Sequence, residues 1–212
     1  MLFGLDPVTI ALRIPILLIV ITVHEFAHAR MAYHYGDSTA ERQGRMNLNP
    51  INHLDPIGSL MILLVGFGWA KPVPINPYNF NKYRSGLRWV SFAGPMSNLI
   101  LSFFSLLLFT ALFNAGLVAF GGLFFSFMQQ LIMINIYLAI FNLIPIPPLD
   151  GSKILMSFLP DSQIGLYQQI ERFAPILLLL LIFSGAFRLI IFPAANSILI
   201  FYNFIIGLIP GL

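Results

Sequence analysis

Two histidines and a glutamate stand close together in a long apolar run near the start of the chain. The motif is His24-Glu25-Phe26-Ala27-His28, and a mostly apolar run over residues 10–23 precedes it. Positions four apart lie on one face of a helix, so His24 and His28 can direct two imidazole nitrogens at one zinc ion. In this arrangement Glu25 is the general base that takes a proton from zinc-activated water. The spacing therefore predicts a catalytic zinc site.

The surroundings of this motif favour a functional site over a chance pattern. Histidines that are simply satisfied in a protein core are the alternative interpretation. The apolar run is long enough to enter a bilayer as a helix. Ionisable groups inside a membrane span are costly, and they are usually functional. We therefore expect His24, Glu25 and His28 to act together.

The composition is that of an integral membrane protein. Of the 212 residues, 58% are hydrophobic and 9% are charged, whereas soluble domains carry about 25% charged residues. The length fits a single membrane-embedded domain over residues 1–212, with a core at about 8–160 and additional spans at about 173–209. The chain has no cysteine, which excludes disulfides, thiolate ligands and a cysteine nucleophile.

The apolar segments predict an all-α polytopic membrane protein with about five transmembrane helices. The expected spans cover residues 7–33, 88–113, 123–144, 173–191 and 194–209, and Pro193 divides the last two. Residues 52–79 hold an apolar stretch too short to cross a bilayer as a helix, followed by prolines at alternate positions, which suit an extended edge strand. We expect this stretch to be a re-entrant or interfacial segment between the first two spans.

The basic residues predict the orientation in the membrane. They gather in two links between spans: Arg30, Arg42, Arg45, Lys71, Lys82, Arg84 and Arg88 in the first, and Lys153 and Arg172 in the second. The turn over residues 114–122 has none. The net charge of +3 therefore relates to topology, and it does not indicate a nucleic-acid partner. We expect a multi-pass protein of the cell membrane, with the N-terminus outside, the C-terminus inside and the zinc motif toward the cytoplasm.

A zinc site needs a third protein ligand, and Asp150 is the strongest candidate. Asp150 follows an apolar span at a proline-rich break, next to Gly151, which permits close backbone approach. A carboxylate also offsets part of the zinc charge in a poorly solvated place. His53 and Asp55 form the alternative pair, although a turn in a polar link is the simpler interpretation of these two residues.

Three motifs together resemble the site-2 proteases, the zinc intramembrane metalloproteases. They are the His24–His28 motif, Gly94-Pro95-Met96-Ser97-Asn98 on the second span, and Asn142 followed eight residues later by Asp150-Gly151. The proline-rich stretch over residues 70–74 further resembles the small members that lack PDZ and CBS domains. The order of the motifs and their placement in the membrane match over residues 20–155.

The resemblance implies one Zn²⁺ per chain, held by His24, His28 and Asp150, with Glu25 as the general base. It also implies that Asn98 and Asn142 assist near the scissile carbonyl. A carboxamide donor can stabilise an oxyanion, but a hydrogen bond between helices is an equally good interpretation of each asparagine.

The expected function is that of an intramembrane endopeptidase. Its substrates are membrane-anchored proteins, cut in or near their transmembrane segments. A metal transporter or channel with a His/Asp transit site is the alternative, as is a relative that binds zinc without activity. Because a substrate helix must unwind before cleavage, we expect Lys71, Val73 and Ile75 to pair with it as a strand. A proline-rich link that only packs at the interface is the other interpretation.

Overall fold

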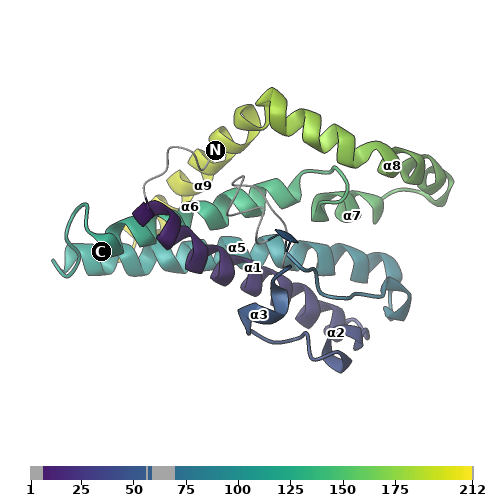
Figure 1. Ribbon diagram of the computed structural model, residues 1–212, viewed down its shortest axis with the longest axis horizontal. Coiled ribbons are helices and arrows are strands. Elements are labelled where there is room, and N and C mark those ends of the chain that lie inside the picture. Colours follow the sequence, from purple (N-terminus) through teal and green to yellow (C-terminus); the bar gives the residue numbers. More distant parts are fainter. Residues whose placement is uncertain (1–6, 56, 59–69, 212) are drawn as a thin grey trace.

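The computed structural model describes residues 7–55, 57–58 and 70–211, and this part of the chain is built from helices (Figure 1). Four helices dominate: α1 (Pro7–His34), α5 (Tyr83–Asn114), α6 (Leu123–Leu143) and α9 (Ala186–Gly207). Each contains a segment long and apolar enough to cross a membrane. The predicted all-α polytopic membrane architecture is therefore confirmed, with four such helices among the described residues rather than five.

Helix α5 packs against both α1 and α6, and α1 and α6 also contact each other (Figure 1). Small and polar residues of α5 are buried at these contacts, including Gly94, Asn98 and Ser102. Small side chains let membrane helices approach closely, and polar ones make hydrogen bonds between them. A core formed by Ile16 and Val20 of α1 with residues of α6 completes the packing. These three helices form the frame that holds the zinc motif.

Short elements connect α1 to α5. They are α2 (Thr39–Arg42), α3 (Pro50–His53) and the 3₁₀ helix η1 (Pro77–Asn79). Leu54 and Ala70 form an isolated antiparallel bridge, and residues 71–76 follow without helix. We call residues 71–76 the proline segment. Its non-helical backbone agrees with the prediction made for residues 52–79, of which residue 56 and residues 59–69 lie outside the described residues.

The C-terminal helices differ from the prediction. After α7 (Asp150–Met156), helix α8 runs over Asp161–Ser184, and α9 begins at Ala186. The break between them is Gly185, whose φ of 74° lies in the left-handed region that glycine adopts most readily. The predicted division at Pro193 is wrong, because Pro193 lies inside α9. The predicted span 173–191 is not among the candidate membrane spans found in the described residues.

The direction of α9 also differs from the prediction. Phe192, near its start, packs on Tyr137 of α6, and Tyr202, near its end, contacts Ser102 of α5. Since Asn98 of α5 lies level with Asn135 of α6, α9 runs parallel to α5. The chain therefore ends near the turn over residues 114–122 (Figure 1). The prediction of a C-terminus on the opposite side from this turn is wrong.

Candidate metal centre

Three donor atoms converge between α1 and α7. The Nε2 atoms of His24 and His28 lie 3.0 Å apart. Oδ2 of Asp150 lies 3.2 Å from His24 Nε2 and 3.1 Å from His28 Nε2. The three residues are 6%, 6% and 7% exposed. Within the described part of the chain, no other group of three His, Cys, Asp or Glu side chains brings its donor atoms within 4.8 Å. Two imidazoles and one carboxylate form a donor set that suits zinc.

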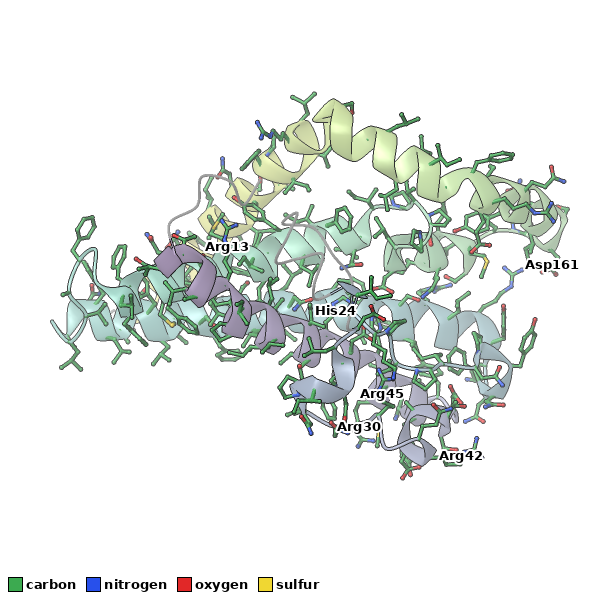
Figure 2. The ribbon with its side chains drawn as sticks, in the orientation of Figure 1. Arg13, His24, Arg30, Arg42, Arg45 and Asp161 are labelled. Carbon is green, nitrogen blue, oxygen red and sulfur yellow. The ribbon has the colours of Figure 1, made fainter. Side chains whose placement is uncertain are left out.

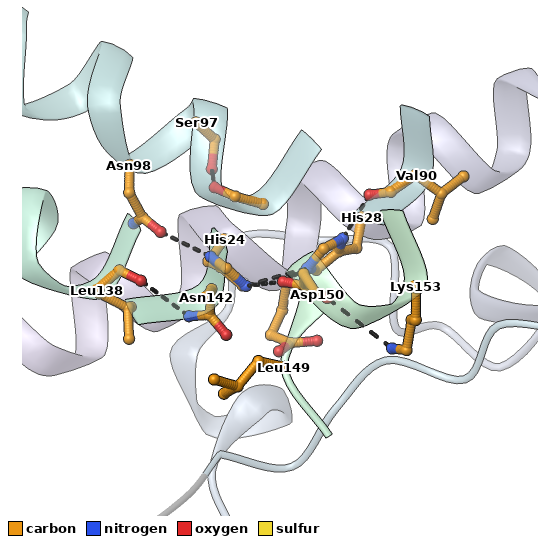
Figure 3. A network of polar contacts seen from close by, with 12 residues as sticks. His24, His28, Val90, Ser97, Asn98, Leu138, Asn142, Leu149, Asp150 and Lys153 are labelled. Carbon is orange, nitrogen blue, oxygen red and sulfur yellow. Dashed lines mark hydrogen bonds and ion pairs between the residues drawn. The ribbon is translucent and has the colours of Figure 1, made fainter. Parts of the chain in front are cut away.

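Helix α1 supplies the histidine pair, and its neighbours fix the tautomer of each ring (Figure 3). The two residues lie one helical turn apart, with ring centroids separated by 4.6 Å. Nδ1 of His28 donates to the backbone carbonyl of Val90 at 2.7 Å, and Nδ1 of His24 donates to Oδ1 of Asn98 at 2.6 Å. A ring protonated at Nδ1 has its lone pair on Nε2. Both lone pairs therefore face the point where the donors converge.

The chain reversal after α6 brings Asp150 to this pair. Helix α7 begins at Asp150, directly beneath the end of α6. A Cβ atom at Gly151 would overlap the backbone carbonyl of Leu143 and lie 2.6 Å from that of Ile144. Glycine is therefore required for this close approach. Asp150 presents Oδ2 to the histidines, and its Oδ1 lies 3.9 Å from Nζ of Lys153.

Gly94 of α5 is buried against the two histidines. A Cβ atom at this position would lie 2.6 Å from Nε2 of His24 and would overlap Nε2 of His28. Only a glycine lets the α5 backbone pass so close to these two Nε2 atoms. The sequence pattern identified Gly94 as part of a motif but did not show that it faces the histidines.

Glu25 lies beside the converging donors and is not one of them. Its Oε2 accepts a hydrogen bond of 2.8 Å from the backbone N–H of Val73 in the proline segment. Glu25 also lines a cavity of about 830 Å³ together with His24, His28 and Asp150. The carboxylate of Glu25 therefore lies beside the converging donors and is joined to the proline segment.

The cavity opens from the metal centre along the membrane-spanning helices. Leu17 and Ile21 of α1 form one wall, Tyr137 and Phe141 of α6 another, and Ile191 of α9 also contributes. The proline segment lines the cavity next to Glu25. The lining is mostly apolar, with the ionisable groups gathered at one end. Apolar walls with a few polar groups are typical of ligand-binding cavities.

A buried aspartate and a partly exposed arginine hold the proline segment in place, and the sequence did not predict this role for either of them. Asp37, just after α1, accepts hydrogen bonds from the backbone N–H of Asn76 at 2.7 Å and from the Asn79 side chain at 2.8 Å. Arg45 donates to the carbonyls of Lys71 and Pro72 at 2.9 and 3.2 Å. Asp37 precedes a short helix in a polar link, and nothing in the sequence distinguishes it from a solvated acid.

The hydrogen bonds to Asp37 alter its acidity. Burial by itself would raise the pKa of Asp37, but the hydrogen bonds from Thr39, Asn79 and Asn76 outweigh it and hold this pKa below its ordinary value. Asp37 is therefore ionised at neutral pH, and its charge strengthens the bonds to the proline segment.

The two predicted asparagines lie in different surroundings. Asn142 lines the cavity, and its Nδ2 donates to the carbonyl of Leu138 at 3.0 Å. Asn98 is fully buried behind His24 and bonds to α1 through the carbonyl of Val20 at 3.1 Å. Asn142 thus faces the cavity, whereas Asn98 makes the contact between helices that was the alternative interpretation.

The remaining predicted residues fall in two places. Val73 and Ile75 line the cavity, whereas Lys71 is exposed next to it. His53 is fully buried, with Nε2 bonded to the carbonyl of Asn47 at 2.9 Å. Asp55 accepts a bond from the backbone of Gly58 at 2.7 Å. Neither His53 nor Asp55 belongs to the group of converging donors, and both make the local contacts of a turn.

Three arginines lie toward the end of α1 that carries the metal centre (Figure 2). Figure 2 shows Arg30, Arg42 and Arg45 on the far side of His24 from Arg13. The histidine pair begins 10 residues before the end of the α1 span at His34. The metal centre is therefore closer to the basic end of the bundle than to the end where Arg13 lies.

Comparisons with known proteins agree with this geometry. Residues 109–184 match the model of peptidase family M50. A protein of Bacillus subtilis (strain 168) named "Putative zinc metalloprotease YwhC" is 41% identical over 184 residues, which cover 85% of this chain and 84% of the relative. The protein Rip2 of Mycolicibacterium smegmatis, whose name carries the same description, is 33% identical over 150 residues, which cover 66% of this chain and 55% of the relative. No solved structure gives a significant match. The chain belongs to peptidase family M50, the site-2 protease family, and it is a zinc metalloprotease of the membrane.

Proposed function

We propose that this metalloprotease cuts membrane-anchored proteins in or near their transmembrane segments. The observation that supports this most directly is the position of the metal centre. The converging donors and Glu25 lie at one end of an apolar cavity walled by helices α1, α6 and α9, all of which are long enough to span a membrane. A protease that acts on soluble chains has no need for a cavity at this depth.

In the proposed site His24, His28 and Asp150 hold one zinc ion. When bound there, zinc lowers the pKa of a water molecule toward about 7 and polarises the substrate carbonyl. Three protein ligands are the usual number in a catalytic zinc site. The buried carboxylate of Asp150 offsets part of the metal charge, and Gly94 leaves room for the ion.

Glu25 acts as the general base in this proposal. Its carboxylate takes a proton from the attacking water and passes it to the leaving nitrogen of the cleaved peptide bond. The hydrogen bond from Val73 to Oε2 restricts rotation of the carboxylate. The base is therefore held in one orientation before the substrate arrives.

Asn142 stabilises the substrate carbonyl as negative charge develops on its oxygen. One hydrogen of its amide is used by the carbonyl of Leu138, and we assign the second to the substrate oxygen. Asn98 has no such role in this proposal, since its amide bonds to Val20 and His24 and lies away from the cavity.

The proline segment receives the unwound substrate as an added strand. A transmembrane helix hides its carbonyls in its own hydrogen bonds, so it must open locally before cleavage. Each freed backbone group then needs a partner, because the membrane supplies none. The proline segment is non-helical, lines the cavity through Val73 and Ile75, and is held by Asp37 and Arg45. Lys71, Val73 and Ile75 are the positions we assign to this pairing.

The active site faces the cytoplasmic side of the cell membrane in this proposal. Arg30, Arg42 and Arg45 lie toward the end of the bundle that carries the metal centre (Figure 2). Such a concentration of basic residues marks the cytoplasmic face of a membrane protein. Water reaches the zinc ion from that side.

The experiment is a cleavage assay on the purified protein in detergent. Two membrane-anchored peptides are compared, one with a Leu-rich helix and one with Gly or Pro near the expected cut, each with and without a chelator. We expect chelator-sensitive cleavage that is much faster for the helix-breaking peptide. Cleavage that survives chelation would contradict the zinc mechanism, and equal rates for the two peptides would contradict the requirement for unwinding.

A further inference from the structure

Another asparagine, Asn135 of α6, is hydrogen-bonded to Asn98 in the middle of the bundle. Its side chain is fully buried, as is that of Asn98. Oδ1 of Asn135 accepts a hydrogen bond of 3.0 Å from Nδ2 of Asn98. Nδ2 of Asn135 donates to the backbone carbonyl of Leu131 at 2.8 Å. Burial of a polar side chain at this depth in a membrane helix is energetically costly, and such residues are usually functional.

The hydrogen bonds through these two amides run in one direction only. The carbonyl of Leu131 is an acceptor, so it must face the NH₂ group of Asn135, and this turns the oxygen of Asn135 toward Asn98. That oxygen in turn requires the NH₂ group of Asn98. The oxygen of Asn98 then faces Nδ1 of His24 and demands a proton there. The series fixes the tautomer that leaves the lone pair of His24 on Nε2.

The two histidines of the pair are held in different ways. His28 donates to a backbone carbonyl, that of Val90, whose orientation no side-chain substitution can reverse. His24 depends on an amide, which presents its oxygen to the ring only while its NH₂ group is held by the carbonyl of Val20 and by Oδ1 of Asn135. With the NH₂ group facing it, His24 would keep its proton on Nε2 and could not bind a metal. His24 is therefore the ligand that needs a supporting partner.

We propose that Asn135 is a positioning residue for the metal centre, acting through the amide of Asn98 to hold His24 in its metal-binding tautomer. The proposal rests on the role of His24 as a zinc ligand in the proposed function. Asn135 touches neither the converging donors nor the cavity. The carbonyl of Val20 gives Asn98 a second anchor, so loss of Asn135 weakens the arrangement without abolishing it.

The main test is zinc affinity, measured by competition with a chelator in detergent. Removing a direct partner of a ligand typically lowers metal affinity about 10- to 100-fold. For Asn135→Leu, one step further away, we expect a loss of about threefold to tenfold. Asn135→Asp keeps the oxygen that accepts from Asn98 and, when the carboxyl group is protonated, the donor to Leu131. We therefore expect its zinc affinity to be close to that of the wild type and above that of Asn135→Leu. Ser102→Ala is the matched control, since Ser102 is equally buried in α5 and bonds to Leu99 and Tyr202 only.

A double substitution shows whether Asn135 acts through Asn98. Asn98→Leu alone should lower zinc affinity more than Asn135→Leu does. Adding Asn135→Leu to it should then change nothing further, because the connection is already broken. An additive loss in the double variant would overturn the proposal, as would an equal loss in Ser102→Ala. If Asn135→Leu does not fold, Asn135→Val lacks the same acceptor and carries the same expectation.

The hydrogen bond from His24 can be observed directly in the zinc-loaded protein, where the Nδ1–H proton of each metal-bound histidine gives its own signal. An Nδ1–H proton that is firmly held in a hydrogen bond exchanges slowly with water. We expect slow exchange at His24 in the wild type and in Ser102→Ala, and faster exchange in Asn135→Leu. An unchanged exchange rate at His24 in Asn135→Leu would contradict the proposal. A wild-type protein that binds zinc but cleaves no substrate would instead overturn the proposed function and leave this comparison intact.

Discussion

The backbone N–H of Val73 donates a hydrogen bond of 2.8 Å to Oε2 of Glu25. The two residues lie 48 positions apart in the chain. This contact joins the proline segment to the proposed base, so one stretch of chain both orients the base and lines the cavity. Displacement of the proline segment is therefore expected to affect catalysis before it affects metal binding.

The substitution Val73→Pro tests this contact. Proline has no N–H, so Glu25 loses its partner while the segment remains extended. We expect the cleavage rate to fall about tenfold, since a small misplacement of a catalytic group is costly, and we expect zinc content to stay at the wild-type level. Val73→Ala keeps the N–H and serves as the control for lost packing. A Val73→Pro enzyme with the wild-type rate would show that the contact is unimportant.

Gly94→Ala tests the closeness of α5 to the histidine pair. The added Cβ atom would overlap Nε2 of His28 and lie 2.6 Å from Nε2 of His24. We expect zinc to be lost from this variant, as measured by metal analysis of the purified protein. Gly165→Ala is the matched control, because no heavy atom lies within 4 Å of a Cβ atom at that position. Full zinc content in Gly94→Ala would contradict the geometry described for the centre.

Asp37→Asn tests the support of the proline segment. In the wild type, both carboxylate oxygens of Asp37 accept hydrogen bonds. The amide in Asp37→Asn would turn an NH₂ group toward one of these donors, so one hydrogen bond is lost and the segment loosens. We expect slower cleavage with unchanged zinc content, together with faster proteolysis near residue 76. Asp161→Asn, at an exposed ion pair with Arg84, is the control. Equal cleavage rates in Asp37→Asn and the wild type would contradict the role of Asp37 in supporting the proline segment.

The acidity of Asp37 adds a pH dependence to this support. Because the pKa of Asp37 is lowered in the folded state, its contribution to stability is present above the unfolded value of about 3.9. It is lost as the pH falls through the lower folded value. We expect the segment to stay attached throughout the neutral range.

Cysteine labelling in intact cells tests the arrangement in the membrane. The native chain has no cysteine, so single cysteines are easily assigned. With α9 parallel to α5, a cysteine at Leu208 should react from the same side as one at Gly116, and a cysteine at Lys82 should react from the other side. Reaction of Leu208 and Lys82 from one side would contradict the direction of α9. Reaction of Lys82 from outside the cell would contradict the proposed orientation.

The sequence predicted the long helices because their apolar runs are bounded by clear signals. The spans expected at residues 7–33 and 123–144 agree with α1 and α6 within one residue at each end. It failed in the C-terminal part, where residues 173–192 hold few polar groups to mark a boundary. Pro193 predicts a break, but membrane helices tolerate proline in their interior. The break is the glycine at position 185, which ends α8 in the left-handed conformation.

The candidate metal ligands could be predicted from residue type and spacing, because the chemistry of zinc restricts both. The supporting residues could not. Asn135 was overlooked, although a polar residue in an apolar span was a usable signal. Asp37 and Arg45 gave no signal, because a charged side chain in a polar link is ordinarily solvated. Their partners, Asn76 and Lys71, come more than 25 residues later in the chain, and such contacts are set by the fold.

The most direct test of the account compares zinc content and cleavage in the same preparations of three proteins. The wild type should bind one zinc ion and cleave an anchored peptide. Glu25→Gln should keep the zinc ion and lose cleavage by a factor of about 10²–10⁴, the usual contribution of a general base. Asp150→Ala should lose both. An active Glu25→Gln enzyme would contradict the assignment of the base, and an Asp150→Ala protein with full zinc content would contradict the metal centre itself.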